Sequence, residues 1–290
     1  MSLTQNIKTY ASLVTFNHTL FALPFAMIGY FLAAIRDGYG FDLRLLGLVI
    51  LCMVFARNAA MSFNRYIDRN IDEANPRTHA RDIPAGRVKA SSALIFAILN
   101  ALLFVAASWF INPLCFYLSP VALLVTLGYS LTKRFSSSSH LVLGLGLSLA
   151  PIGSYIAVSG EFRLLPVMFS ACVVFWVSGF DIIYALQDES YDRDNKLHSL
   201  PVLLGIRNAL RLSSLFHVIS FLFVVAAGVV WNFGYLYWIG CAIFSTLLIT
   251  QHRLVKPDDL SKLNFAFFTT NGIASLLFSA CVIADLFLHP

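Results

Sequence analysis

The sequence predicts an all-α protein that crosses a membrane several times. Hydrophobic residues make up 58% of the chain and charged residues only 12%, against about 25% charged residues in an average soluble protein. Long apolar runs recur from end to end, and a helix of about 20 residues spans the hydrocarbon core of a bilayer. The alternating segments of about 10 residues that are typical of a membrane β-barrel do not occur. Because a backbone within lipid must satisfy its own hydrogen bonds, the runs are expected to be helices.

Nine of these runs are expected to form transmembrane helices, within a single integral-membrane domain over residues 1–290. The five cysteines lie within or at the edges of the runs, without a CxxC motif or a Cys/His cluster. We expect them to pack as small hydrophobic side chains and to form no disulfide. In chain order, the runs cover residues 18–35, 45–67, 91–111, 114–132, 140–159, 164–187, 209–231, 234–251 and 265–288.

Basic residues are concentrated in every second connection between the runs, and this asymmetry orients the chain. By the positive-inside rule the connections after the second, fourth, sixth and eighth runs are cytoplasmic, and Lys8 places the N-terminus on the same side. An odd number of spans then leaves the C-terminus outside. We therefore expect a multi-pass protein of the inner or plasma membrane, whose net charge of +5 implies no nucleic-acid partner. The basic residues of the predicted cytoplasmic side are Arg69, Arg77, Arg81, Arg87, Lys89, Lys133, Arg134, Arg193, Lys196, Arg207, Arg253, Lys256 and Lys262, against Arg36, Arg44 and Arg163 on the other side.

A first acidic motif lies where the second run leaves the membrane. Asn64, Asp68 and Asp72 follow one another at steps of four residues. Residues four apart lie on the same face of a helix. The three side chains are therefore expected to share one face at the cytoplasmic end of this span.

A second acidic motif, 181-DIIYALQDESYD-192, lies at the matching end of the sixth run. Asp181, Asp188 and Asp192 again fall on one helical face, with Tyr184 alongside. Asp68 and Asp188 are 120 positions apart, as are Asp72 and Asp192. The common offset predicts two related four-helix units that face each other, followed by one additional helix.

Carboxylates at two facing helix ends point to a bound divalent cation. A single Asp at the centre of a bilayer costs about 2.5–3.5 kcal/mol, and neighbouring carboxylates disfavour one another's ionisation. Mg²⁺ reverses this cost, because it binds carboxylate oxygens and completes its shell with water and phosphate oxygens. The two motifs therefore predict a site for Mg²⁺ and a diphosphate. The alternative is that the acids and arginines pair with one another on a solvated loop.

Together these motifs resemble the UbiA superfamily of intramembrane prenyltransferases. The likeness rests on NxxxDxxxD followed by 76-PRTHARDIPAG-86, on DxxYxxxDxxxD, and on the YxxxK pair of Tyr129 and Lys133. The resemblance implies nine helices around a central cavity, with cytoplasmic cap segments near residues 73–90 and 189–206. It also implies Mg²⁺-dependent transfer of a prenyl group from its diphosphate to an aromatic acceptor, in ubiquinone or menaquinone synthesis.

The resemblance assigns roles to individual residues. One Mg²⁺ would be held by Asn64, Asp68 and Asp72, and a second by Asp188 and Asp192. Asp181 would orient the acceptor or take its proton, and Asp68 and Asp188 would act in catalysis beside it. Tyr184 would contact the acceptor. The residues expected to contact the diphosphate are Arg77, Arg81, Tyr129, Lys133 and Lys196.

Arg57 suggests the chemistry of the acceptor. It lies seven residues before Asn64, and so on nearly the same face, about two turns deeper in the second span. A guanidinium at that depth calls for an anionic partner, and its fork fits a carboxylate. We expect it to bind the carboxylate of an aromatic acid such as 4-hydroxybenzoate; the alternative is pairing with Asp181 or another acid of the protein, or hydrogen bonds to helix carbonyls. The first span, 16-FNHTLFALPFAMIG-29, lacks an Arg that many 4-hydroxybenzoate enzymes carry, and Asn17 or His18 would have to replace it.

A secondary transporter is the rival interpretation. Ionisable residues within the membrane and an internal repeat suit one. Transporter sites, however, tend to lie near the midplane at broken helices, whereas these acids gather at helix ends. The expected partners are therefore a polyprenyl diphosphate, an aromatic acid and membrane lipid.

Overall fold

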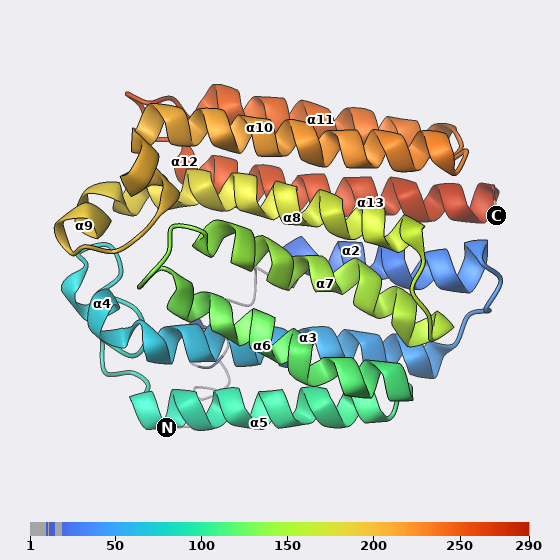
Figure 1. Ribbon diagram of the computed structural model, residues 1–290, viewed down its shortest axis with the longest axis horizontal. Coiled ribbons are helices and arrows are strands. Elements are labelled where there is room, and N and C mark those ends of the chain that lie inside the picture. Colours follow the sequence, from blue (N-terminus) through green and yellow to red (C-terminus); the bar gives the residue numbers. More distant parts are fainter. Residues whose placement is uncertain (1–9, 11, 15–18, 290) are drawn as a thin grey trace.

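The computed structural model describes residues 10, 12–14 and 19–289, and these residues form helices joined by turns (Figure 1). The only pairing of extended backbone among them is an isolated bridge between Lys256 and Asp259. The prediction of an all-α protein is therefore confirmed. The expectations for Lys8, Asn17 and His18 lie outside the described residues.

The helices follow one another as a series of long segments interrupted by short ones. The short segments are those near the two acidic motifs and those flanking the last helix. In chain order the elements are α2 (Thr19–Phe31), η2 (Leu32–Arg36), α3 (Leu43–Ile67), α4 (Arg69–Ala74), α5 (Ala90–Trp109), α6 (Pro113–Thr132), α7 (Ser139–Ser159), α8 (Leu164–Ala185), η3 (Leu186–Asp188), α9 (Glu189–Asp194), α10 (Leu200–Val230), α11 (Tyr235–Leu254), α12 (Leu263–Phe265), η4 (Ala266–Thr270) and α13 (Asn271–Leu288).

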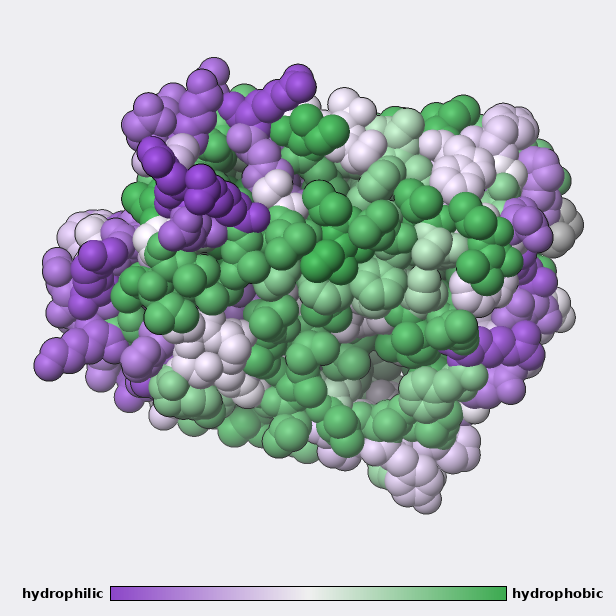
Figure 2. Space-filling view, turned by 45° about the horizontal axis from the view of Figure 1, so that its top comes forward, coloured by the Kyte–Doolittle hydropathy of each residue, from purple (hydrophilic) through white to green (hydrophobic). Residues whose placement is uncertain are grey.

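Seven helices of the described chain are long and apolar enough to cross a membrane. They correspond to seven of the nine expected runs. The first run forms a shorter apolar helix, Phe21–Arg36, and the eighth forms α11, which is not among the seven. A multi-pass membrane protein is confirmed, while the count of nine spans is not. Hydrophobic side chains form a broad band across the molecule, with hydrophilic side chains gathered at its two ends (Figure 2).

One pair of elements recurs along the chain at the offset of the two acidic motifs. A long helix, α3 or α8, is followed in each half by a six-residue helix, α4 or α9. These short helices start at Arg69 and Glu189, 120 positions apart. Both lie at the same end of the molecule (Figure 1), which we call the α4/α9 end. The hydroxyl of Tyr191 in α9 donates a hydrogen bond of 3.1 Å to the carbonyl of Ile71 in α4, so the two short helices are in contact.

A glycine brings α7 close to α8. A Cβ atom added at Gly144 would lie 2.5 Å from the carbonyl oxygen of Val174 and 2.5 Å from Oγ of Ser178. The hydroxyl of Ser178 also donates a hydrogen bond of 3.1 Å to the carbonyl of His140. Gly146, two residues along the same helix, differs: a Cβ there would lie 3.6 Å from its nearest neighbour, which is an ordinary contact. Close approach therefore depends on Gly144.

A bend in α10 places its first turn at the α4/α9 end. Gly205 has φ of 75°, a left-handed conformation inside the helix that glycine adopts without strain. The residues before it belong to the cap segment expected near 189–206. The seventh run was expected to begin near residue 209, whereas α10 begins at Leu200, where the side chain of Ser199 accepts a hydrogen bond from the backbone of Val202. The five cysteines are free, as expected.

Candidate active site

A polar cavity of about 260 Å³ lies at the α4/α9 end and gathers nearly all of the predicted site residues. Both acidic motifs line it, together with the predicted diphosphate-binding residues except Lys196. Lys196 is exposed and is not among the residues that line the cavity, so its predicted role has no support in this arrangement. The predicted residues that line the polar cavity are Arg57, Asn64, Asp68, Asp72, Arg77, Arg81, Tyr129, Lys133, Asp181, Tyr184, Asp188 and Asp192.

Each acidic motif crosses a break between two helices. The first long helix ends at Ile67, and Asp68 serves as its C-cap and as the N-cap of α4. Backbone hydrogen bonds from Asp68 to Asn64 (2.9 Å) and from Asp72 to Asp68 (2.8 Å) keep the four-residue spacing across the break. In the second half Asp188 occupies the equivalent position before α9. The motif side chains therefore face one cavity although neither helix is continuous.

Basic side chains pair with both aspartates of the first motif. Arg81 Nη1 lies 2.6 Å from Oδ1 of Asp72, and Lys133 Nζ lies 3.1 Å from Oδ2 of Asp68. These pairs match the alternative in which the acids and arginines satisfy one another. Their location differs from that alternative, because the two carboxylates are almost fully buried and line a cavity, whereas the alternative placed them on a solvated loop.

Arg77 joins the first cap segment to the second acidic motif. Its guanidinium binds the Asp188 carboxylate with two nitrogen atoms, one through a hydrogen bond of 2.8 Å from Nε. The side chain of Asn75 donates a further hydrogen bond of 3.0 Å to the same carboxylate. Burial by itself lowers the pKa of Arg77, but the hydrogen-bonded Asp188 carboxylate raises it above the ordinary value. Arg77 is thus a permanent positive charge at the edge of the polar cavity.

Tyr184 forms an aromatic wall of the polar cavity. Its ring stacks on Phe267 with a centroid distance of 4.2 Å. The guanidinium of Arg77 lies over the Tyr184 ring, 5.4 Å from the ring centre. It also donates a hydrogen bond of 3.2 Å to the Tyr184 hydroxyl. An electron-rich wall beside a cationic group can accept a further planar ring or a cation.

The residues of the cavity fit a divalent cation that also binds a diphosphate. Among the described residues, no three His, Cys, Asp or Glu side chains lie close enough together to enclose a metal ion. However, Oδ2 of Asp72 is buried and has no hydrogen-bond partner there. A buried carboxylate oxygen without a partner is costly unless a cation approaches it. The acids of the two motifs offer the oxygen ligands that Mg²⁺ takes, and Mg²⁺ commonly fills its remaining positions with water and phosphate oxygens.

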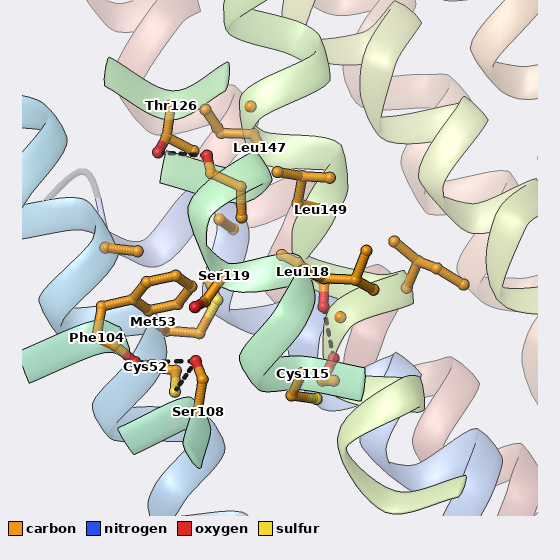
Figure 3. Close-up of a pocket in the computed structure, with 18 of the residues that line it drawn as sticks. Cys52, Met53, Phe104, Ser108, Cys115, Leu118, Ser119, Thr126, Leu147 and Leu149 are labelled. Carbon is orange, nitrogen blue, oxygen red and sulfur yellow. Dashed lines mark hydrogen bonds between the residues drawn. The ribbon is translucent and has the colours of Figure 1, made fainter. Parts of the chain in front are cut away.

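An apolar pocket of about 340 Å³ adjoins the polar cavity, between α3, α5, α6 and α7. Cys52 and Met53 of α3 lie beside Phe104 and Ser108 of α5 along its lining (Figure 3). The residues that line both spaces are Arg57, Met61, Tyr129, Leu143 and Leu147. The molecule therefore holds a charged compartment next to a hydrophobic one, with five lining residues in common.

Arg57 lies at the boundary of the two spaces without a counter-ion. Its Nε and Nη2 atoms are buried and have no hydrogen-bond partner among the described residues. Asp181, the partner considered from the sequence, instead accepts a hydrogen bond from His140. Pairing of Arg57 with Asp181 is thus not found, and two nitrogen atoms of its guanidinium are buried without a partner among the described residues.

Several residues of the site escaped the sequence analysis. His140 follows a run of serines, Asn75 precedes the first cap segment, and Arg134 was expected only as a basic residue of the cytoplasmic side. The structure places His140 against Asp181, Asn75 on Asp188, and Nη2 of Arg134 within 3.3 Å of Asp68. For Asn75 the available signal was its position directly before 76-PRTHARDIPAG-86. A lone histidine gave no comparable signal.

Comparison with known proteins agrees with this geometry. Residues 22–273 match the UbiA prenyltransferase family. The chain is 28% identical over 286 residues to the 4-hydroxybenzoate octaprenyltransferase of Nitrosospira multiformis, covering 98% of this chain and 97% of that protein. It is 29% identical to the 4-hydroxybenzoate octaprenyltransferase of Aeromonas hydrophila, covering 83% of this chain and 84% of the relative.

Solved structures share the fold. A UbiA homologue from Aeropyrum pernix K1, solved in its apo form, superposes with a TM-score of 0.84 at 30% identity and covers 92% of this chain and 98% of its own. A UbiA homologue from Archaeoglobus fulgidus, bound to DMAPP and Mg²⁺, superposes with a TM-score of 0.74 at 19% identity, covering 97% and 99% of the two chains. With both acidic motifs in one cavity and a family match over most of its length, the chain belongs to the UbiA prenyltransferase family and is a membrane prenyltransferase.

Proposed function

We propose that the protein transfers a polyprenyl group from its diphosphate to an aromatic acid, 4-hydroxybenzoate or a related precursor of ubiquinone or menaquinone. The observation that carries the proposal is the joining of two compartments at Arg57. One compartment holds carboxylates, arginines and a lysine, and the other is lined by apolar side chains. A charged diphosphate with a hydrophobic tail needs both compartments.

The charged compartment would hold the diphosphate. The carboxylates of both motifs and Asn64 would hold Mg²⁺, which supplies positive charge to the leaving diphosphate. Arg77, Arg81 and Lys133 now pair with Asp188, Asp72 and Asp68. On binding, these cations would turn from the carboxylates to phosphate oxygens and stabilise the negative charge that develops as the allylic C–O bond breaks. Tyr129, which lines both spaces, would hydrogen-bond the same group. Metal-bound relatives support the role of the cation.

The free guanidinium of Arg57 would bind the carboxylate of the acceptor. An unpaired buried donor gains a charge-assisted hydrogen bond when a carboxylate arrives. Asp181 lines the same cavity and would accept a hydrogen bond from the acceptor hydroxyl, with the ring beside Tyr184. The names of the relatives, 4-hydroxybenzoate octaprenyltransferases, support an acceptor that carries both groups.

The carbon–carbon bond would form at the boundary between the compartments. As the allylic C–O bond breaks, its electron pair leaves with the diphosphate, and a ring carbon of the acceptor supplies the pair for the new C–C bond. The ring then loses its proton and regains aromaticity. The apolar side chains around the prenyl tail would exclude water, which otherwise competes for the allylic cation.

The protein would lie in the inner or plasma membrane, with the polar cavity open to the cytoplasm. The concentration of Lys and Arg in the connections at the α4/α9 end supports this orientation. A water-soluble acid would then enter from the cytoplasm, while the isoprenoid diphosphate would reach the apolar pocket from the bilayer.

A product assay tests the proposed function. Purified protein in lipid is given geranyl diphosphate, Mg²⁺ and one acceptor at a time: 4-hydroxybenzoate, a hydroxynaphthoate, or 4-methylphenol, which lacks the carboxylate. Mass spectrometry should detect prenylated product with an aromatic acid and little with 4-methylphenol. Equal product from 4-methylphenol would contradict the assigned carboxylate site, and no product with any acid would contradict the function.

A further inference from the structure

Asp181, the first acid of the second motif, is in contact with His140, a residue that belongs to neither motif. Nδ1 of His140, in the first turn of α7, lies 2.7 Å from Oδ2 of Asp181 in α8. The His140 side chain is 4% exposed and that of Asp181 is 21% exposed. Both residues line the polar cavity. The pair therefore stands at the wall of the cavity with the histidine behind the carboxylate.

The other ring nitrogen of His140 fixes which atom carries the proton. The backbone N–H of Leu200, the first residue of α10, donates a hydrogen bond of 3.4 Å to Nε2. An amide N–H can only donate, so Nε2 must present its lone pair. The neutral imidazole then carries its proton on Nδ1 and directs it at Asp181. Three helices thus set one hydrogen bond: α7 supplies the ring, α8 the carboxylate and α10 the amide.

The remaining oxygen of Asp181, Oδ1, receives no hydrogen bond from the residues that the structure describes. A carboxylate held at Oδ2 by a directed N–H has a fixed plane, so its second oxygen has a fixed direction. Close packing of α7 on α8 at Gly144 maintains this geometry, because the glycine allows backbone contact one turn beyond His140. In a serine-hydrolase triad a carboxylate orients an imidazole base. Here the imidazole of His140 orients the carboxylate of Asp181, which is in the position of the base.

We propose that His140 is a positioning residue that fixes the orientation of the Asp181 carboxylate and aims its Oδ1 at the hydroxyl group of the aromatic acceptor; this rests on the proposed function. When the ring attacks the allylic carbon, the acceptor hydroxyl gives its proton to Asp181 Oδ1, and the ring becomes a neutral dienone. The dienone then loses the proton from its alkylated carbon to the released diphosphate and takes one back from Asp181 at oxygen. The net products are the alkylated phenol, diphosphate and one proton, and Asp181 is restored.

The second cap segment, near residues 189–206, contacts both His140 and Lys133. The Leu200 amide belongs to the turn that follows α9, and α9 carries Asp192 of the second metal-binding motif. The backbone of His198 in the same turn donates a hydrogen bond of 2.9 Å to the carbonyl of Lys133, a predicted diphosphate ligand. The segment that contacts the donor site therefore also sets the tautomer at the acceptor site.

Steady-state kinetics on two substitutions test the inference. His140→Phe keeps an aromatic ring but removes the donor to Asp181. His140→Asn places an amide N–H near the former Nδ1. His289→Phe, at the opposite end of the molecule, is the matched control. With geranyl diphosphate and 4-hydroxybenzoate we expect His140→Phe to lower kcat by about 10- to 100-fold, the range of a hydrogen bond to a charged group, with the KM for geranyl diphosphate unchanged. His140→Asn should recover most of the loss, and His289→Phe should match the wild type.

The outcomes separate the positioning role from a structural one. A purely structural histidine would lower the activity of both His140 variants together or raise the KM of both substrates, and either result overturns the inference. Wild-type turnover by His140→Phe overturns it as well. If the wild-type protein prenylates no aromatic acid, the proposed function fails first, and the inference fails with it; if the wild type is active, only the variants decide the role of His140.

Discussion

Arg81 donates a hydrogen bond of 2.6 Å to Oδ1 of Asp72, while Oδ2 of the same carboxylate is buried without a hydrogen-bond partner among the described residues. Only one of the two Asp72 carboxylate oxygens therefore has a hydrogen-bond partner there. A buried acceptor left without a partner costs about 1–3 kcal/mol. A cation bound at Oδ2 would remove that cost and would weaken the hold of Asp72 on Arg81. In the proposed function, metal binding at Asp72 would therefore be coupled to release of Arg81 toward the phosphate.

Asp188→Asn should abolish most turnover. The substitution removes the charge that Arg77 binds and one expected metal ligand, while the shape of the side chain is kept. We expect kcat/KM to fall by about 10²- to 10³-fold, the effect of losing one electrostatic stabiliser in an active site. Asp194→Asn, at an exposed position on the same short helix α9, is the matched control and should retain activity. Equal activities of the two variants would contradict the role of Asp188.

Arg57→Met should separate acceptor binding from stability. The buried guanidinium has two nitrogens without partners, and an apolar side chain of similar length removes that desolvation cost. We therefore expect the Tm in detergent to stay the same or rise. The KM for 4-hydroxybenzoate should rise about 10- to 100-fold, with little change in the KM for the prenyl diphosphate. Equal increases in both KM values would show that Arg57 does not bind the acceptor.

Arg81→Met and Lys196→Met should have different effects, although each removes one positive charge. Arg81 lines the polar cavity beside Asp72, whereas Lys196 is exposed and outside it. The first variant should raise the KM for geranyl diphosphate by about tenfold or more, because a charge-assisted hydrogen bond to phosphate is lost. The second should stay within about twofold of the wild type, since an exposed charge contributes little. A strong effect of Lys196→Met would restore the role predicted from the sequence.

Gly144→Ala and Gly146→Ala test the packing that supports the site. A Cβ at Gly144 would meet a backbone oxygen at 2.5 Å, so α7 would have to move away from α8. Overpacking of this kind costs about 1–3 kcal/mol, and the movement would separate His140 from Asp181. We expect a lower Tm and a lower kcat for Gly144→Ala. Gly146→Ala, with its nearest contact at 3.6 Å, should leave both close to wild type; if the two variants behave alike, α7–α8 packing does not set the site.

The sequence predicts the scaffold well because membrane helices depend on local composition. The second run was expected over residues 45–67 and forms Leu43–Ile67, and the fifth was expected over 140–159 and forms Ser139–Ser159. The first run is the weak case, since an α-helix ends at Phe31 and a π-helical turn completes it. The start of α10 was also missed, because Arg207 and Asn208 interrupt the apolar pattern, whereas the helix begins at Leu200.

The candidate site is predictable where spacing or burial carries information. Arg57 stands out as a charge within an apolar run, and Asp68 and Asp188 stand out through their common offset. Pairing between distant residues has no such local signal. The bond from Asn75 to Asp188 joins residues 113 positions apart, and His140 reaches Asp181 only because two helices pack closely at a glycine. These contacts depend on the tertiary fold and are visible only in three dimensions.

The most direct test of the account is release of pyrophosphate by the purified protein in lipid, supplied with geranyl diphosphate, Mg²⁺ and 4-hydroxybenzoate. The same reaction is run with EDTA, with EDTA followed by excess Mg²⁺, and without the acceptor. We expect release that requires both the metal and the aromatic acid, is lost with EDTA and returns with Mg²⁺. Release that continues with EDTA, or no release with any aromatic acid, would contradict a metal-dependent prenyl transfer at this site.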